Sequence, residues 1–361
     1  MSLSIAIVGL PNVGKSTLFN VLTGAEVLAA NYPFATIEPN SGIVPVPDTR
    51  LSILAEMYSS EKIIPATVQF TDIAGLVKGA SEGEGLGNKF LANIRECDAI
   101  IHIVRAFEDS SILRHDQTPT TPKNDIEIIN TELCLADLQT IDKRIPKLQK
   151  EAKAKPSVRD EISYLESLRH HLQSGTPLSS LPSLDEEKIA DLHLLTAKPT
   201  IYVFNMGESE LGDEVKKTEL TKLVAPAESV FIGAKLEEEL HDLDENDARE
   251  LLESYGVKDS GLNQMVHAAY STLGLQSYLT AGPKEVRAWT IHHGWTAPQA
   301  AGVIHTDFEK GFIAVQIINY NDLVAAGSEQ AAKAAGKIAT VGRDYIMRPD
   351  DVVEFRFNVS K

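Results

Sequence analysis

A glycine-rich segment near the N-terminus constrains the fold of this chain most strongly. The residues GLPNVGKS, from Gly9 to Ser16, follow the short apolar run SIAIV and precede a stretch with helical spacing that ends at Gly24. This order of strand, glycine loop and helix is typical of a P-loop, whose backbone N–H groups surround phosphate groups at a helix N-terminus. The segment therefore predicts a nucleotide-binding site.

Two side chains of this loop have the chemistry that a triphosphate requires. Lys15 neutralises the β- and γ-phosphates and is a candidate catalytic residue, and the Ser16 hydroxyl is a candidate Mg²⁺ ligand. The alternative is a glycine turn without a ligand. Because the motif lies between a predicted strand and a predicted helix, we favour the phosphate site.

Four further apolar runs predict strands of a mostly parallel sheet, because the stretches between them are long enough for crossover connections. The runs are ATVQFTDIAG, CDAIIHIVRAF, PTIYVFNMG and SVFIGA. The fold class is therefore an α/β P-loop NTPase.

Apolar residues at helical spacing between residues 125 and 172 predict two antiparallel helices joined by a basic turn, KLQKEAKAKP. The hairpin is either an arm that contacts a partner or a helical pair packed on its own domain. After residue 274 the segments EVRAWTI, GFIAVQII and DVVEFRF predict a small mixed domain. We expect a nucleotide-binding domain over residues 1–124 and 196–274, the hairpin insertion over 125–195, and a C-terminal domain over 275–361.

A second phosphate-site motif follows the strand TVQFT. In the sequence Asp72-Ile73-Ala74-Gly75, the Asp72 carboxylate would hold Mg²⁺ through water and the Gly75 amide would contact the γ-phosphate. Alone this pattern is weak, but at this distance after a P-loop it predicts a switch that orders when triphosphate binds. Thr36, between the two motifs, is the candidate for the second Mg²⁺ hydroxyl.

Base recognition is expected after the strand PTIYVF. Many GTPases carry NKxD there, whereas this chain has Asn205-Met206-Gly207-Glu208. Methionine in place of lysine and a longer carboxylate weaken the guanine clamp and favour adenine. Met206 offers an apolar surface to the purine ring, and its alternative role is packing in the core. Gly233 and Ala234 are expected to close over the base.

The residue after Gly75 is Leu76, which cannot orient an attacking water as glutamine does in many GTPases. Slow intrinsic hydrolysis is expected unless another group contributes. One candidate for assisting hydrolysis is His115 in a polar loop, although it could equally be a solvated loop histidine. The other candidate is a potassium ion near Asn12.

Charge and cysteine content restrict the partners. The net charge of −17 argues against a protein that holds nucleic acid with its whole surface, and no DNA partner is expected. Two cysteines are too few for a disulfide framework, and the N-terminus has neither a signal peptide nor a membrane span, so we expect a cytoplasmic protein without a membrane partner. A monomer is also expected. The C-terminal 86 residues are neutral, and their cations Lys284, Arg287, Lys310, Arg343 and Arg348 could meet RNA.

Over essentially its whole length the chain resembles the YchF family, the Obg-like ATPases. The motifs that carry this resemblance are GLPNVGKST, NYPFATIEPN, DIAGLVKGA, GEGLGN, NMGE, LTAGPKEVRAWT and APQAAGVIHTDFEKGFI. The resemblance implies a P-loop domain of translation-factor type, a coiled-coil insertion, a C-terminal TGS domain with a β-grasp fold, ATP preference and binding to ribosomes.

Carried over residue by residue, the family's functional positions agree with those reached above. Mg²⁺ ligands fall on Ser16 and Thr36. Nucleotide contacts are expected from Asn12, Val13, Gly14, Lys15, Ser16, Thr17, Asn205, Met206, Glu208, Gly233 and Ala234. The family's mobile-loop histidine is offset here, as ILRH, which separates His115 from the usual pattern.

We therefore expect an enzyme that hydrolyses ATP to ADP and phosphate and whose nucleotide cycle controls binding to the ribosome, through the large subunit or the whole particle and its rRNA, in translation or a stress response. Two alternatives remain. One is an Obg-type GTPase, because Asn205 and Glu208 could accept hydrogen bonds from guanine. The other is a nucleotide-sensing, ribosome-binding module in which hydrolysis is incidental.

Overall fold

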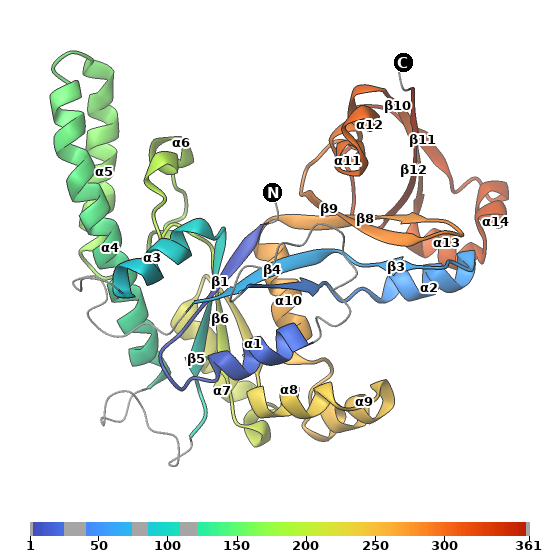
Figure 1. The fold of residues 1–361 in the computed structure, drawn as a ribbon, viewed down its shortest axis with the longest axis horizontal. Coiled ribbons are helices and arrows are strands. Elements are labelled where there is room, and N and C mark those ends of the chain that lie inside the picture. Colours follow the sequence, from blue (N-terminus) through green and yellow to red (C-terminus); the bar gives the residue numbers. More distant parts are fainter. Residues whose placement is uncertain (1–2, 25–40, 74–85, 109–120, 359–361) are drawn as a thin grey trace. The chain divides into compact units, whose positions relative to one another are not determined.

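The computed structural model describes residues 3–24, 41–73, 86–108 and 121–358, which divide into two compact units (Figure 1). The first unit comprises Met1–Val44 and Gln69–Thr272, and the second comprises Pro45–Val68 and Leu273–Lys361. The predicted domain boundaries stay a prediction. The compact units differ from them in two respects. Pro45–Val68 folds with the C-terminal residues, and residues 125–195 belong to the same unit as the nucleotide-binding segment.

The first unit is built on a six-stranded sheet. In spatial order its strands are β2 (Ser41–Pro45), β4 (Thr67–Asp72), β1 (Ser4–Val8), β5 (Ala99–Arg105), β6 (Thr200–Asn205) and β7 (Glu228–Ile232). From β4 to β7 every neighbouring pair is parallel. All seven residues of β5 are buried, as expected for a central parallel strand covered on both faces.

Helices connect these strands and surround the sheet (Figure 1). They are α1 (Lys15–Gly24), α3 (Leu86–Glu96), α4 (Pro122–Glu151), α5 (Arg159–Leu172), α6 (Glu186–Ile189), α7 (Glu214–Val224), α8 (Ala234–His241), α9 (Glu245–Ser254) and α10 (Gly261–Thr272). The acidic stretch before residue 250, for which the sequence indicated no elements, forms α8 and α9. Asp244 caps α9 by accepting from the backbone N–H groups of Asn246 and Asp247.

The predicted hairpin consists of α4 and α5, which project from the sheet side by side (Figure 1). Ile141, Ile145 and Leu148 of α4 are buried in one cluster with Leu165 and Leu168 of α5, which accounts for the helical spacing of these residues. The returning chain is fixed to α4 by the buried Asp137. Its carboxylate accepts from the backbone N–H groups of Leu195 and Thr196, both at 2.8 Å.

The second unit contains another six-stranded sheet. In spatial order its strands are β11 (Ala339–Val341), β10 (Phe312–Asn319), β12 (Asp351–Phe357), β8 (Leu275–Ala281), β9 (Val286–His292) and β3 (Ile63–Ile64). Its helices are α2 (Thr49–Tyr58), α11 (Ala297–Ile304), α12 (Thr306–Lys310), α13 (Tyr320–Ala326) and α14 (Glu329–Ala334). β8 and β12 are parallel neighbours, and α11 packs on one face of the sheet, as a β-grasp domain requires.

The predicted fold class is confirmed: a P-loop fold with a mostly parallel sheet, a helical insertion and a separate C-terminal domain. Both cysteines, Cys97 and Cys134, are free and buried. Among the helices of the described ranges, none combines the length and the apolarity that a membrane span needs.

Candidate nucleotide-binding site

A pocket of about 890 Å³ lies in the first unit where the loops after β1, β4, β5, β6 and β7 meet. These loops all leave the carboxyl ends of parallel strands, the edge at which α/β sheets bind ligands. The pocket volume lies within the usual range for small-molecule sites. Most of the sequence-predicted nucleotide residues line it: Asn12, Gly14, Lys15, Ser16, Thr17, Asn205, Met206, Glu208 and Ala234.

The loop after β1 has the backbone that its glycines predict. Asn12 has φ +64° and Gly14 has φ +92°, and a side chain at Gly14 would also place its Cβ 2.4 Å from Asn205 Nδ2. Only glycine fits this position. Helix α1 then begins at Lys15, and the Leu18 N–H donates to the Gly14 carbonyl at 3.0 Å. The first turn of a ten-residue helix therefore faces the pocket, which favours an anionic ligand.

Lys15 is buried, with 8% of its surface exposed, and its ammonium forms an ion pair with the Asp72 carboxylate at the end of β4. A buried ammonium requires a negative partner. In this arrangement Asp72 supplies the negative partner that the Lys15 ammonium requires. The sequence motifs placed Lys15 and Asp72 in one site, and the structure brings the two side chains into contact.

Asn205 connects the phosphate loop to the loop after β7. Its Nδ2 donates to the Val13 carbonyl at 2.9 Å, and its Oδ1 accepts from the Ala234 N–H at 3.0 Å. The side chain is buried, so both bonds form away from water. Sequence reasoning treated Asn205 as a base contact, and the bridging geometry could not be read from local sequence.

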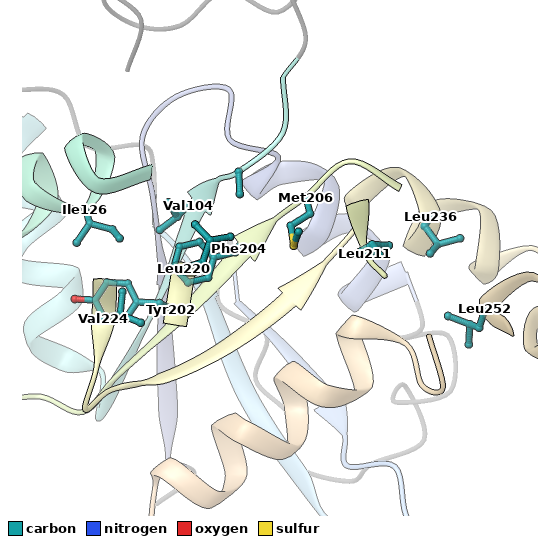
Figure 2. Packing of buried hydrophobic residues seen from close by; sticks show 11 residues of the cluster. Val104, Ile126, Tyr202, Phe204, Met206, Leu211, Leu220, Val224, Leu236 and Leu252 are labelled. Atoms are coloured by element: carbon teal, nitrogen blue, oxygen red, sulfur yellow. The ribbon is translucent and has the colours of Figure 1, made fainter. Parts of the chain in front are cut away.

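Met206 forms part of the pocket wall and part of the protein core at once. It is buried in a cluster with Phe204 and Leu211, and Figure 2 shows it lying past Phe204 at the end of β6. Its backbone N–H donates to the Ile232 carbonyl at 2.8 Å. The two roles considered for Met206 are therefore compatible, because its apolar side chain is fixed by the core and borders the pocket.

Glu208 and Phe107 complete the same side of the pocket. The charge of Glu208 raises the pKa of Tyr255, so the carboxylate lies beside the tyrosine hydroxyl. The Arg105 guanidinium lies 4.4 Å from the centre of the Phe107 ring and orients it. Phe107, Glu108 and Glu238 were missed from the sequence, although the position of Phe107 two residues after a buried strand is a usable indication of a site residue.

The side chains of this pocket favour a divalent cation. Lys15 and Lys235 face four carboxylates, those of Asp72, Glu108, Glu208 and Glu238. A polyphosphate would add further negative charge, which requires a counter-cation. The Ser16 hydroxyl is exposed to the pocket, and the residue set fits Mg²⁺, which keeps several waters and binds few protein groups. The described ranges contain no cluster of three or more His, Cys, Asp or Glu side chains that could hold a metal ion.

Four predicted positions lie outside the described residues: Thr36, Gly75, Leu76 and His115. Their roles stay predictions. Of the remaining positions, Val13 contributes its carbonyl to Asn205. Gly233 precedes α8, and a Cβ there would make a tight contact, 3.0 Å from Leu211 Cδ1.

Two family profiles match the chain. The profile of the YchF-GTPase C-terminal family, described as a protein of unknown function, matches residues 275–358. The profile described as a 50S ribosome-binding GTPase matches residues 4–158.

Full-length relatives match as well. The Ribosome-binding ATPase YchF of Bacillus subtilis is 47% identical over 367 residues, with 99% of this chain and 100% of the relative covered. The protein of the same name from Escherichia coli O157:H7 is 49% identical over 364 residues, with the same coverage. The solved structure of the Schizosaccharomyces pombe YchF GTPase superposes with a TM-score of 0.85 at 38% identity and covers 98% of both chains.

Proposed function

This chain belongs to the YchF family of P-loop NTPases, and on that premise we propose that it is an Mg²⁺-dependent ATPase that binds ribosomes in a nucleotide-linked manner in the cytoplasm. Curated relatives from Bacillus subtilis and Escherichia coli carry the name Ribosome-binding ATPase. The observation that carries the proposal is the pocket at the strand ends, where Lys15 and Asp72 meet beside an apolar wall formed by Met206.

Phosphate binding requires an exchange of partners at Lys15. The ammonium leaves Asp72 for the β- and γ-phosphate oxygens, and the backbone of the loop around Gly14 surrounds the phosphates. Ser16, and Thr36 by prediction, would hold Mg²⁺, with Asp72 bound to it through water. The metal ion supplies neutralisation of charge that develops on the phosphate oxygens.

Adenine is favoured over guanine by two features of the pocket. The amide of Asn205 is held in place by its bonds to Val13 and Ala234, which leave one N–H and one lone pair for a base of either kind. Met206 offers an apolar surface where NKxD proteins have lysine, and the Glu208 carboxylate lies beside Tyr255. A guanine edge would then lose hydrogen-bond partners on burial, which is costly.

Calorimetric titration of nucleotide-free protein with ATP and with GTP, with Mg²⁺ present, tests this specificity. We expect ATP to bind at least about tenfold more tightly, and the double variant Met206→Lys/Glu208→Asp to shift the ratio toward GTP. Met206→Leu is the matched control because it keeps an apolar wall. Equal or tighter GTP binding by the unaltered protein would contradict the adenine assignment and favour the GTPase alternative.

The same titration with potassium exchanged for sodium tests the cation near Asn12. Weaker binding or slower turnover in sodium supports a potassium site, and equal values in both salts contradict it. Turnover without a stimulating partner is expected to be slow, because Leu76 cannot orient water.

Cosedimentation with ribosomes tests the nucleotide link. We expect the bound fraction to differ between nucleotide-free protein, the ADP complex and a complex with a non-hydrolysable ATP analogue. Binding that is equal in all three states would favour the scaffold-like module in which hydrolysis is incidental. Separate sedimentation with large and small subunits tests the expected large-subunit contact, and light scattering tests the expected monomer.

A further inference from the structure

A second cavity, of about 430 Å³, lies wholly within the second unit. Its wall combines residues of β8, β10 and β12 with residues of α2, α11, α12 and α14 and of adjoining loops. The volume is within the usual range for sites that bind small molecules. The nucleotide function proposed above does not use this cavity.

The cavity forms where two strands of the second sheet separate, and Figure 1 shows β12 running across the direction of β8. On one side β12 pairs with β10 over Asp351–Phe357, but on its other side the described residues pair with it only at Val352, opposite Leu279. Four consecutive residues of β12, 352–355, line the cavity. Because side chains of a strand alternate between its two faces, four consecutive residues contact one cavity only along the edge of the strand. The strand arrangement therefore creates the cavity.

The inner wall of the cavity is apolar and its mouth is acidic. Ile317 of β10 and Val353 of β12 are 6% and 7% exposed and belong to the core of the second unit, so they form the inner wall. Glu329 of α14 and Glu354 of β12 also line the cavity but are exposed to solvent, where a carboxylate keeps its hydration. This arrangement fits a ligand that has an apolar body and one polar end.

The two carboxylates at the mouth lack a cation. Among the described residues, no Lys, Arg or His lines the cavity, and the ion pairs of the second unit are formed by other carboxylates. Glu329 accepts a hydrogen bond from the Tyr58 hydroxyl at 3.2 Å, which uses only part of the acceptor capacity of a carboxylate. The mouth therefore offers negative charge and hydrogen-bond acceptors, which favour a cationic group on the ligand.

We propose that the second cavity binds a small primary amine, whose ammonium group lies at Glu329 and Glu354 and whose hydrocarbon part enters the apolar interior. An ammonium group has three N–H donors and can contact both carboxylates. A phosphorylated or carboxylated ligand would bring like charges together at the mouth, and a wholly apolar ligand would desolvate the carboxylates without giving them a partner. The inference goes beyond the proposed ATPase function and does not depend on it.

The tryptophan residues make this binding measurable. Both tryptophans of the chain, Trp289 and Trp295, lie in the second unit and pack against its core. The Trp289 indole N–H donates to Thr280 Oγ1 at 2.9 Å, and Thr280 is part of the cavity wall. The residues that line the nucleotide pocket include no tryptophan in the described part of the chain. Intrinsic tryptophan fluorescence of the full-length protein therefore reports on the second unit.

The first test titrates the full-length protein with hexylamine, followed by tryptophan fluorescence and by calorimetry. Hexanol and hexanoate serve as the neutral and anionic controls, because they have the same hydrocarbon length. At neutral pH and constant ionic strength we expect saturable binding of hexylamine, at least about tenfold weaker binding of hexanol, and no saturable binding of hexanoate. The difference follows from the charge-assisted hydrogen bonds that only the ammonium group forms.

The second test removes the two charges at the mouth. Glu329→Gln/Glu354→Gln keeps the size of both side chains and should bind hexylamine at least about tenfold more weakly, close to the affinity for hexanol. The matched control Glu309→Gln/Asp344→Asn removes two exposed carboxylates of the same unit that do not line the cavity, and it should bind hexylamine as the unaltered protein does.

Three results would overturn the inference: no saturable hexylamine binding by either measurement, equal affinities for hexylamine and hexanoate, or unchanged hexylamine binding by Glu329→Gln/Glu354→Gln. Both double variants should retain the ATP affinity of the unaltered protein, which shows that they are folded. A protein that binds hexylamine through these carboxylates but does not hydrolyse ATP supports the inference and contradicts the proposed function.

Discussion

The nucleotide pocket and the turn of the α4–α5 hairpin, whose residues 143–159 are here termed the basic end, use lysine in opposite ways. Lys15 is buried and paired with Asp72, whereas Lys147, Lys150 and Lys153 are exposed and have no ion-pair partner among the described residues. A buried ammonium cannot remain without a counter-charge, so its ligand must replace an existing partner. Exposed ammonium groups keep their hydration and can gain a partner without losing one.

This difference separates two kinds of binding. At Lys15 the ligand competes with Asp72, so binding depends on the geometry of one pair and is weakly screened by salt. At the basic end the cations are exposed, so the ionic contacts they make are strongly screened by salt. The predictions below alter one side of the comparison at a time.

The largest effect is expected at Lys15. Lys15→Ala removes the charge that stabilises the transferring phosphate, so kcat/KM for ATP should fall by at least about 100-fold. Steady-state phosphate release measures it. Lys198→Ala is the matched control, because Lys198 is another partly buried lysine, which donates to the Arg95 carbonyl at 3.1 Å, outside the pocket. Turnover of Lys15→Ala at the unaltered rate would refute the catalytic role.

Asn205 should produce the next largest change. Asn205→Ala leaves the Val13 carbonyl and the Ala234 N–H without their buried partner, which costs about 1–3 kcal/mol. We expect a lower unfolding free energy in urea together with about tenfold weaker nucleotide binding. The partly exposed Asn263, which donates to Asp259 at 3.0 Å, provides a control in Asn263→Ala. A loss of stability with nucleotide affinity intact would limit Asn205 to a structural role.

A third prediction concerns a buried group that carries no charge. His102 lies in β5, its Nε2 has no hydrogen-bond partner in the described part of the chain, and burial lowers its pKa to about 3. In the unfolded chain histidine takes up a proton below about pH 6.5. Between these two values the unfolded state binds more protons, so stability should fall by about 1.4 kcal/mol for each unit of decreasing pH.

Urea unfolding between about pH 4.5 and 6 checks this slope, within the window set by the two pKa values. His102→Phe removes the titrating group and should flatten the dependence by that amount. His170→Gln alters an exposed histidine of α5 and should leave the slope unchanged. An equal slope for His102→Phe and the unaltered protein would show that His102 does not titrate on unfolding.

The smallest effect is expected for the stability of the basic end. Lys147→Gln/Lys150→Gln/Lys153→Gln should change the unfolding free energy by less than about 0.5 kcal/mol, because exposed cations without partners contribute little. Arg144→Gln loses ion pairs to Glu161 and Asp191 and should cost about 1 kcal/mol. A larger loss for the triple variant than for Arg144→Gln would mean that these lysines serve the fold.

The sequence was sufficient to predict those elements of the fold that are determined by interactions between neighbouring residues. The central strands β1, β5 and β6 are nearly continuous apolar runs because both faces of the sheet are covered there. Gly14 is predictable because the loop requires a positive φ. The hairpin followed from helical spacing that packs Ile145 and Leu148 into one core. The family resemblance added the C-terminal β-grasp domain.

The remaining features depend on contacts between distant residues. The two bonds of Asn205 join positions 13 and 234 to position 205, and nothing near Asn205 in the sequence indicates them. Residues Pro45–Val68 fold with the C-terminal unit because β3 pairs with β9, and Arg50 lies 3.0 Å from Asp350. Phe107 was overlooked because aromatic residues after a strand occur in many loops that bind nothing.

The position of Asn205 has a thermodynamic consequence. Since one amide holds both the phosphate loop and the loop expected to cover the base, the free energies with which the two ends of a nucleotide bind should not be additive. A ligand that fixes one loop lowers the entropy that the other loop still has to lose. The binding free energy of an intact nucleotide should then be more favourable than the sum of the binding free energies of a nucleoside and a polyphosphate.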